Sequence, residues 1–279
     1  MDFNQNKIEA SVIISTYNAV AWLEKVIWGF NCQTVSNFEI VIADDGSGLE
    51  TKAKIAELQK IVKFPIVHVW HEDDGFQKTK ILNKAILASS ADYLIFTDGD
   101  CVPRKDFIAA HFANRAVDTF LSGGYFKLPM SVSELITKSD IDNQNCFDLN
   151  WLNANGFTTN SKSIKLTKSA FLAALMNKIT PTKATWNGHN ASCYKKDILA
   201  VNGFNEEMKY GGEDRELGER LFNKGLTAKQ IRYSAICIHL DHARGYVSDE
   251  IWKKNNDIRA FTKANKVIAT PNGINSNSL

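Results

Sequence analysis

The sequence predicts an α/β fold in which a mostly parallel, Rossmann-like central sheet is flanked by helices. Short apolar runs rich in β-branched residues alternate with amphipathic segments over residues 11–97. Strands that alternate with helices at this spacing form parallel sheets with right-handed crossovers. Each apolar run also ends in polar residues, and parallel sheets bind ligands beyond the carboxyl ends of their strands.

The first part of the chain supplies four predicted strands and three predicted helices. The strands are predicted at residues 11–15, 38–43, 66–70 and 93–97. Apolar residues at three- and four-residue spacing predict the helices at 20–30, 55–62 and 81–88. The last of these strands is almost wholly apolar, as expected of a strand that is covered on both faces.

The regular alternation fades near residue 122. Residues 140–160 are rich in Asn and Asp, a composition that predicts a variable loop or short helices. The further predicted elements are a helix at 164–179, a strand at 235–238 and a helix at 251–267. Residues 270–279 contain Pro, Gly, Asn and Ser and predict a flexible tail. We therefore expect one domain over residues 1–269.

Composition and charge predict an ordinary globular protein. Hydrophobic residues make up 44% of the chain, and 33 Lys and Arg nearly balance 31 Asp and Glu. The basic residues are spread along the chain, so we expect no nucleic-acid partner. The five cysteines include no CxxC pair, which is typical of reduced thiols rather than a disulfide framework or a zinc site.

The start of the chain is polar, and no apolar run approaches the ~20 residues needed to cross a bilayer. These features predict a cytoplasmic protein, with at most peripheral contact at the inner face of the membrane. They do not indicate an oligomeric state.

Two aspartates follow the strand at 93–97, with one glycine between them. Gly99 permits a tight turn that can direct the carboxylates of Asp98 and Asp100 toward one ion. Carboxylate oxygens are the ligands that Mg²⁺ and Mn²⁺ prefer. We expect Asp100 to hold the metal and Asp98 to act beside it, either on a ribose or through water. The alternative is a solvated turn, because Asp-Gly is a common turn sequence.

A second acidic cluster follows a pair of glycines. Gly211 and Gly212 lead into a predicted helix that begins with Glu213 and Asp214. Acidic residues in a first helical turn also interact favourably with the helix dipole, so an N-terminal cap is one interpretation. A carboxylate that mobile glycines present at a helix start can also act as a general base toward an attacking hydroxyl.

Two histidines, His239 and His242, follow the predicted strand at 235–238. A histidine at a strand end is often structural, but it can also complete the coordination of a metal. We favour His239 as the ligand because it lies closer to the strand. The segment does not have the His-Glu-x-x-His spacing of a zinc-protease helix.

Five short motifs occur in order along the chain. They are residues 12–18 (VIISTYN), 44–47 (DDGS), 74–76 (DGF) with Lys80 and Asn83, 98–100 (DGD), and 211–214 (GGED). This order resembles the family 2 glycosyltransferases of the GT-A fold, over residues 11 to about 242. Through residues 186–190 (WNGHN) and 202–206 (NGFNE), the second half resembles chondroitin-polymerase-like, β-1,4-galactosyltransferase-like and polypeptide GalNAc-transferase-like enzymes.

The resemblance implies an inverting transferase that moves a hexose or N-acetylhexosamine from a UDP-sugar to a hydroxyl of a glycan or lipid-linked oligosaccharide. Surface polysaccharide or lipopolysaccharide synthesis is the implied setting. Residues 1–121 would bind the nucleotide-sugar, residues 122–250 would bind the acceptor and supply the base, and 251–269 would form a C-terminal helix.

The resemblance also implies roles for individual residues. Mn²⁺ or Mg²⁺ would be held by Asp98, Asp100 and His239, with His242 as second choice. Asp214 would be the catalytic base, with Glu213 beside it. The implied nucleotide-sugar contacts are Thr16, Tyr17, Asn18, Asp44, Asp45, Asp74, Gly75, Phe76, Lys80, Asn83, Asp98 and Gly99. The implied acceptor or sugar contacts are Trp186, Asn190, Tyr210, Gly211 and Gly212.

Two positions depart from the family pattern. Tyr210 stands where relatives commonly have Trp, which preserves an aromatic wall but puts the associated sugar preference in doubt. Gln77 stands where relatives often have Arg, so Lys78 or Lys80 would have to replace that cationic contact.

Two other functions compete with this interpretation. A nucleotidyltransferase also combines a Rossmann-like sheet with acidic metal ligands, but it usually has an early Gly-rich phosphate loop, and residues 15–18 (STYN) offer none. A non-catalytic nucleotide-sugar-binding protein would bind UDP and metal without turnover, and Asp214 argues against it.

Overall fold

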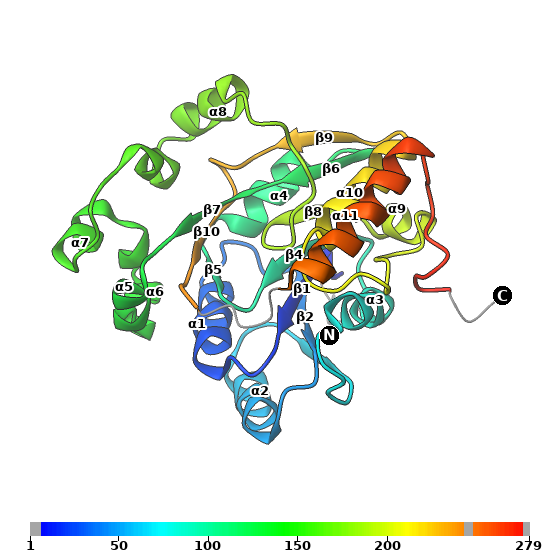
Figure 1. Ribbon diagram of the computed structural model, residues 1–279. Coiled ribbons are helices and arrows are strands. Elements are labelled where there is room, and N and C mark those ends of the chain that lie inside the picture. The colour runs from blue at the N-terminus through cyan, green and yellow to red at the C-terminus, as the bar shows by residue number, and fades with distance from the viewer. Residues whose placement is uncertain (1–6, 243–247, 276–279) are drawn as a thin grey trace, which may run out of the picture.

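The computed structural model describes residues 7–242 and 248–275. The strands in this part of the chain are β1 (Ala10–Thr16), β2 (Phe38–Asp44), β3 (Ile66–Trp70), β4 (Tyr93–Asp98), β5 (Cys101–Pro103), β6 (Thr119–Ser122), β7 (Gly124–Lys127), β8 (Ala191–Tyr194), β9 (Thr227–Gln230) and β10 (Ile236–His239). Seven of them form a central sheet in the order β3-β2-β1-β4-β8-β6-β9, and three form a smaller sheet in the order β5-β10-β7 (Figure 1).

The helices surround these sheets. The α-helices are α1 (Val20–Asn31), α2 (Leu49–Ile61), α3 (Lys78–Ala88), α4 (Phe107–Asn114), α5 (Met130–Leu135), α6 (Lys138–Asp142), α7 (Leu149–Ala154), α8 (Ala170–Ile179), α9 (Lys195–Ala200), α10 (Glu213–Asn223) and α11 (Asp249–Ala264). Two 3₁₀ helices, η1 (Asn145–Phe147) and η2 (Ser161–Leu166), lie among them.

The central sheet confirms the predicted α/β fold. β1 pairs in parallel with β2 and β4, and β2 pairs in parallel with β3. β8, from the second half of the chain, runs antiparallel to both β4 and β6. The two halves of the sequence therefore share one sheet, and the start of β8 lies beside the carboxyl end of β4.

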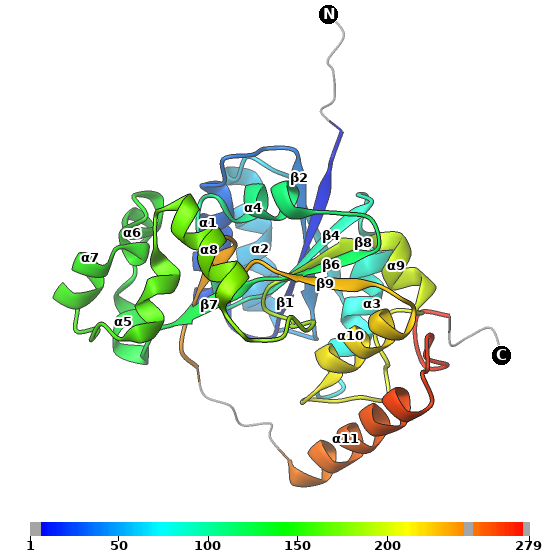
Figure 2. The same cartoon turned by 90° about the horizontal axis from the view of Figure 1, so that it is seen from above.

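Strands β1, β2 and β4 in the middle of the sheet are buried on both faces, which explains their largely apolar sequences. Alternate residues of β1 enter different cores, because side chains of a strand point to opposite faces. Val12 and Ile14 pack with α1, α2 and α4 on one face. Ile13 packs with α3, α9 and α10 on the other. Figure 2 shows these helical layers on either side of the sheet.

The smaller sheet was only partly predicted. The predicted strand at 235–238 corresponds to β10, but β5 and β7 were not predicted because each has only three or four residues. The predicted short helices within 140–160 are present as α6, η1 and α7. The helix predicted at 164–179 is confirmed only over residues 170–179, which form α8. Its first part is wrong, because residues 161–166 form η2 and α8 begins only where Ser169 accepts the amide of Leu172.

The C-terminal region is partly tied to the rest of the molecule. α11 matches the predicted final helix and packs against α10. Residues 270–275 do not behave as the predicted flexible tail, because Thr270 is buried and its amide bonds to Val201, while the amide of Ile274 bonds to Asn202. Residues 276–279 of that prediction lie outside the described part. No described helix is both long and apolar enough to cross a bilayer.

Candidate active site

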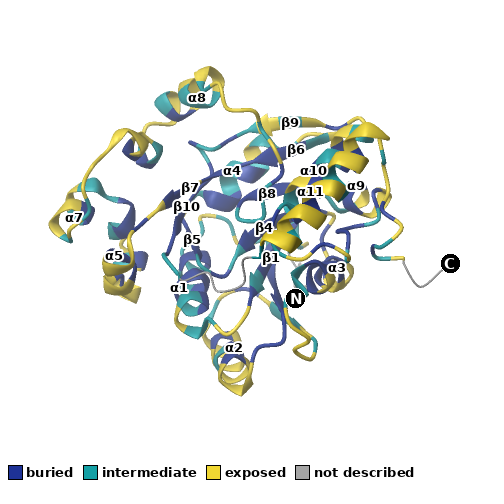
Figure 3. Ribbon diagram, in the orientation of Figure 1, coloured by how far each residue is buried: buried dark blue, intermediate teal, exposed yellow. Residues whose placement is uncertain are grey.

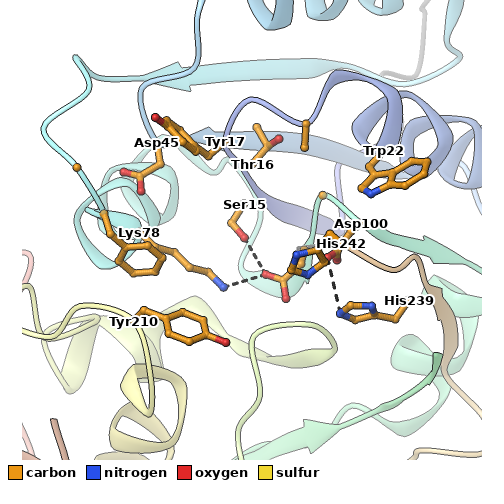
Figure 4. Close-up of a pocket in the computed structure, with 15 residues that line it drawn as sticks. Ser15, Thr16, Tyr17, Trp22, Asp45, Lys78, Asp100, Tyr210, His239 and His242 are labelled. Atoms are coloured by element: carbon orange, nitrogen blue, oxygen red, sulfur yellow. Dashed lines mark hydrogen bonds and ion pairs between the residues drawn. The ribbon is translucent and has the colours of Figure 1, made fainter. Parts of the chain in front are cut away.

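A cavity of about 460 Å³ opens beyond the carboxyl ends of β1 and β4. Its lining residues are Ser15, Thr16, Tyr17, Ala19, Trp22, Asp45, Gly75, Phe76, Lys78, Asp98, Gly99, Asp100, Tyr210, His239 and His242. Figure 4 shows Tyr17 and Asp45 toward one end of the cavity, and Asp100, His239 and His242 grouped at the other. Segments from both halves of the chain therefore meet at one site.

The first end of the cavity is built by the loops after β1 and β2. The Thr16 hydroxyl is buried without a hydrogen-bond partner among the described residues. One Asp45 oxygen lies 2.8 Å from Nε2 of His71, and the other accepts the Gln77 amide at 3.0 Å. Burial raises the pKa of Asp45. Tyr17 is half exposed and donates to Asp73 at 2.9 Å.

Two predicted nucleotide-sugar contacts instead shape this loop. Asp44 is fully buried and accepts the Ser47 amide at 2.8 Å, with its other oxygen 2.9 Å from Nε2 of His68. The Asn18 side chain accepts the Gly48 amide at 3.0 Å. Neither residue lines the cavity, because their polar atoms are directed at neighbouring backbone and side chains.

The segment before α3 places only part of its predicted set in the cavity. Gly75 and Phe76 line it, whereas Asp74 is exposed and accepts from the Gln77 side chain. Lys80 is exposed and lies outside the lining, and Lys78 occupies the cavity instead. Lys78 is the first residue of α3, and its ammonium group donates to Asp98 at the end of β4.

Asn83 is not at the nucleotide-sugar site, contrary to the prediction. Its side-chain amide donates to the Phe204 carbonyl and to the Glu206 carboxylate, both at 2.9 Å, and its oxygen accepts the Phe204 amide at 2.8 Å. These bonds satisfy a buried polar group and join α3 to the loop at residues 202–206.

Asp98, at the end of β4, has a fixed ionic environment. One of its oxygens accepts from Ser15 Oγ at 2.7 Å and from Lys78 Nζ at 2.9 Å. Burial alone would raise the pKa of Asp98, but Lys78 and the hydrogen bonds lower it to about 2. Burial likewise opposes the charge on Lys78, but Asp98, Asp214 and Glu213 raise its pKa well above the ordinary value. Both groups are therefore charged at neutral pH.

Asp100 faces the two predicted histidine ligands. Its Oδ2 lies 3.0 Å from Nε2 of His242 and 3.7 Å from Nε2 of His239, and the two rings stack at 5.6 Å. Ligand atoms of Asp100, Cys101 and His239 lie within 4.8 Å of one another. Asp98, which we predicted as a further ligand, is not among these grouped atoms of the described residues.

The chemistry of this group fits a divalent cation. A carboxylate and imidazoles are suitable ligands for Mn²⁺. Nδ1 of His239 is buried and has no hydrogen-bond partner within the described chain, so no hydrogen bond at that atom competes with metal binding. Burial raises the pKa of the Cys101 thiol well above its usual range, and the thiol donates a hydrogen bond to Oδ1 of Asp100 at 3.3 Å. Cys101 is therefore protonated and is a poor ligand.

The predicted base lies at the start of α10. Gly211 and Gly212 both have positive φ angles, 109° and 90°, a conformation that glycine adopts without steric strain. The turn they form directs Asp214 toward Gly188, where an added Cβ would lie 2.6 Å from a carboxylate oxygen. Glu213 is buried and accepts the Gly211 amide at 2.8 Å.

The environment of Asp214 suits proton transfer near neutral pH. Burial raises the pKa of Asp214 to about 7; Lys78 opposes this shift, whereas Glu213 and Asp98 reinforce it. Oδ1 of Asp214 is buried without a hydrogen-bond partner in the described chain. A carboxyl group with this pKa can accept a proton and release it again at physiological pH.

Trp186 and Asn190 are not at the acceptor site, contrary to the prediction. Trp186 is only 1% exposed and packs edge-on against Phe96 at 5.3 Å. Asn190 is fully buried and donates to the carbonyls of Gly124 at 2.8 Å and Ala235 at 3.0 Å. Trp186 therefore belongs to the core against the central sheet, and Asn190 joins the start of β8 to the smaller sheet.

Tyr210 is an aromatic wall of the cavity, as its position in the motif suggested. Its ring lies 5.8 Å from that of Phe76, in an edge-to-face arrangement, and 6.4 Å from that of Trp252 on α11. The wall therefore combines residues from the donor side and from the C-terminal helix.

Sequence reasoning missed His189. Its ring packs against Tyr125 at 4.6 Å, and its charge is influenced by Asp98, Asp100 and His239. Burial lowers the pKa of His189 to about 4, so the ring is neutral at neutral pH. No sequence signal identified it, because β8 was not predicted, and its antiparallel pairing with β4 is what places the preceding residues beyond the carboxyl end of β4.

Comparisons with known proteins agree with this geometry. Residues 11–116 match the model for glycosyl transferase family 2, and residues 175–243 match the model described as the N-terminal domain of galactosyltransferase. An uncharacterized glycosyltransferase of Bacillus subtilis, YfnE, is 25% identical across 91% of this chain and 68% of its own length. The Escherichia coli chondroitin synthase is 23% identical across 91% of this chain but only 36% of its own length.

Solved structures share the fold. The mannosyltransferase PcManGT of Pyrobaculum calidifontis, solved with GDP-Man and Mn²⁺, superposes with a TM-score of 0.59 at 18% identity and covers 94% of this chain and 65% of its own. TarS of S. aureus, in complex with UDP-GlcNAc, gives 0.61 at 16% identity, over 93% of this chain and 70% of its own. The fold is that of the GT-A glycosyltransferases. The matching family models and relatives support a family 2 glycosyltransferase.

Proposed function

We propose that this chain is a metal-dependent, inverting transferase that moves a hexose or N-acetylhexosamine from a UDP-sugar to a hydroxyl of a glycan or lipid-linked oligosaccharide. Two relatives support the donor and acceptor classes. TarS is in complex with UDP-GlcNAc. A Campylobacter jejuni relative, 25% identical over 73% of this chain, is named GalNAc(5)-diNAcBac-PP-undecaprenol beta-1,3-glucosyltransferase. A role in surface polysaccharide or lipopolysaccharide synthesis follows from this proposal.

One observation carries the proposal: Lys78 lies within the electrostatic influence of both Asp98 and Asp214. Asp98 belongs to the donor-binding half of the chain, and Asp214 is the acid with a pKa of about 7. Asp214 does not itself line the cavity, so the charge of Lys78, which lines it, is what supports a shared site for the predicted phosphate-side acid and the predicted base. A nucleotide-sugar transferase needs these two functions to act on opposite sides of the same sugar.

Asp100 and His239, with His242, are the residues that would hold Mn²⁺ or Mg²⁺. When bound, the cation supplies positive charge that stabilises the diphosphate leaving group. Lys78 contributes a second, permanent positive charge on the same side of the cavity. Preorganised charge of this kind stabilises developing negative charge without reorganisation during the reaction.

Thr16, Asp45 and Asp214 would position and activate the reactants. Thr16 and Asp45 would contact the base and ribose, since their polar atoms lie at the first end of the cavity. Asp214 would accept the proton of the acceptor hydroxyl as its oxygen bonds to the anomeric carbon. The bond from that carbon to the diphosphate breaks at the same time, and its electron pair leaves with UDP. One displacement inverts the anomeric configuration.

The test measures UDP release and sugar transfer with a panel of UDP-sugars, with and without Mn²⁺. Asp100→Asn should weaken metal-dependent nucleotide binding. Asp214→Asn should retain that binding and reduce transfer by about 10²–10⁴-fold. Asp92→Asn, at an exposed acid before β4, is the matched control.

Three outcomes would count against the proposal. Full transfer by Asp214→Asn would exclude this residue as the base. Release of a sugar 1-phosphate in place of UDP would identify a nucleotidyltransferase. Tight UDP binding without any donor consumption across the panel would favour a non-catalytic nucleotide-sugar-binding protein.

A further inference from the structure

α8 exposes a row of large apolar side chains. Phe171, Leu175 and Ile179 are 79%, 41% and 57% exposed. They are spaced four residues apart and so share one face of the helix. Ala173 is the one α8 residue that is buried. Figure 3 shows α8 as a largely exposed helix at the edge of the molecule, with its inner side only partly covered.

The sequence around this helix is strongly basic. Between Asp148 and Asp197 the chain contains no Asp or Glu. Five lysines flank or belong to α8: Lys162, Lys165, Lys168, Lys178 and Lys183. This imbalance is local, because the whole chain has a formal net charge of only +2.

Most of this positive charge is available to a partner. Lys162, Lys178 and Lys183 are exposed and form no ion pair with residues in the described ranges. Lys168 pairs with Asp148 at 2.8 Å, but it remains 75% exposed. Lys165 instead lies against Tyr125 and donates to its carbonyl at 3.1 Å. The apolar row and these lysines, residues 162–183, are called here the α8 patch.

We propose that the α8 patch binds the surface of an anionic lipid bilayer. A short amphipathic helix with an apolar face and flanking lysines lies in the plane of the interface, with its apolar side chains among the acyl chains and its lysines at the phosphates. The ten residues of α8 are too few to cross a bilayer. A protein partner would need a larger, shape-complementary interface than this narrow row offers, whereas lipids adapt to it.

The α8 patch also lies next to the active site. The ring of Tyr125, which Lys165 contacts, packs against His189 at 4.6 Å and His239 at 5.5 Å. Docking through α8 would therefore hold the cavity close to the membrane surface. The benefit of holding the cavity there rests on the proposed function, because a lipid-linked acceptor is presented at the membrane surface. The lipid binding itself does not depend on the proposed function.

The test is co-sedimentation of the full chain with phosphatidylcholine vesicles and with vesicles that also contain phosphatidylglycerol. We expect binding to the anionic vesicles, weakened by salt because the lysines interact within a Debye length. Replacing Phe171, Leu175 and Ile179 together by Ser should reduce the affinity at least tenfold. Replacing Lys162, Lys178 and Lys183 by Glu should reduce it by about a hundredfold or more, since each lysine contributes about fivefold.

The matched controls lie on α2, at the opposite end of the molecule from α8 (Figure 1). Leu49 and Ile61 are 84% and 59% exposed, and Lys52 and Lys60 are exposed on the same helix. Leu49→Ser with Ile61→Ser, and Lys52→Glu with Lys60→Glu, should leave vesicle binding within twofold of the unmodified chain.

Several outcomes would overturn the proposal. Equal sedimentation with neutral and anionic vesicles would exclude the charge argument, and unchanged binding by both α8 variants would exclude the patch. Self-association that is lost with the Ser variant, without vesicle binding, would identify the patch as an interface between two copies. Metal-dependent UDP binding, measured in parallel, should be unchanged in the α8 variants. Vesicle binding without any sugar transfer would refute the proposed function and leave this inference intact.

Discussion

The ionised form of Asp214 should destabilise the folded protein, and Asp214→Asn should relieve that effect. The carboxyl group has a pKa of about 7 in the folded chain, compared with an ordinary value of 3.8. A group whose pKa is raised by folding favours the fold when protonated. The corresponding stability is fully present below about pH 4 and is lost as the pH rises through 7.

The magnitude follows from the size of this shift. Each pKa unit corresponds to about 1.4 kcal/mol, so a shift of roughly three units sets an upper limit of about 4 kcal/mol. Asp214 as a whole is partly exposed to solvent. Water that reaches the carboxylate reduces the free-energy cost of burying its charge. We expect the free energy of unfolding of the unmodified chain, relative to Asp214→Asn, to fall by about 2–4 kcal/mol between pH 4 and pH 8.

Urea denaturation in the presence of a chelator measures this difference, because no bound cation then changes the field at the site. The unmodified chain, Asp214→Asn and the surface control Asp92→Asn are compared at both pH values. Asp92 is exposed, so the free energy of unfolding of Asp92→Asn should differ from that of the unmodified chain by the same amount at both pH values. If the difference for Asp214→Asn also stayed the same, within about 0.5 kcal/mol, the buried-carboxylate argument would be wrong.

The remaining predictions concern catalysis and the support of the base. In the unmodified chain, kcat/KM for transfer should rise about tenfold per pH unit below pH 7 and level off above it, because Asp214 must be ionised to accept a proton; a flat profile from pH 5 to pH 8 would contradict this. Lys78→Met should raise KM for the donor at least tenfold in steady-state kinetics, since Asp98 loses the cation 2.9 Å away. An unchanged KM would contradict this. Arg220→Met should lower the free energy of unfolding by about 3–5 kcal/mol, because it leaves Glu216 as an unpaired buried charge. A loss below about 1 kcal/mol in thermal and urea denaturation would contradict this.

The fold could be predicted from the sequence because its central strands are buried on both faces. Strands such as β1 and β4 are continuous apolar runs, and polar residues can follow them only where the sheet ends. The positions of Asp98 and Asp100 at that edge follow from this pattern alone. Short strands such as β5 and β7 give no comparable pattern, because their pairing depends on β10, more than a hundred residues away.

The direction of individual side chains could not be predicted in the same way. Residues 186–190 form one motif, yet Trp186 enters the core, Asn190 donates to buried carbonyls, and the ring of His189 packs against Tyr125. A motif locates a segment, but the pairing of β8 decides the direction of its side chains. Asn83 illustrates the same limit, because its partners in residues 204–206 are far away in the sequence.

Lys78 explains how two nearby acids acquire different functions. It bonds directly to Asp98, and burial and Lys78 together leave the pKa of that carboxyl at about 2. Asp214 interacts electrostatically with the same lysine, but burial together with the charges of Glu213 and Asp98 raises its pKa to about 7. Acids whose pKa values are separated in this way have separate roles. Asp98 is a permanent charge that holds Lys78 in the cavity, and in the proposed mechanism Asp214 is the group that exchanges a proton during transfer.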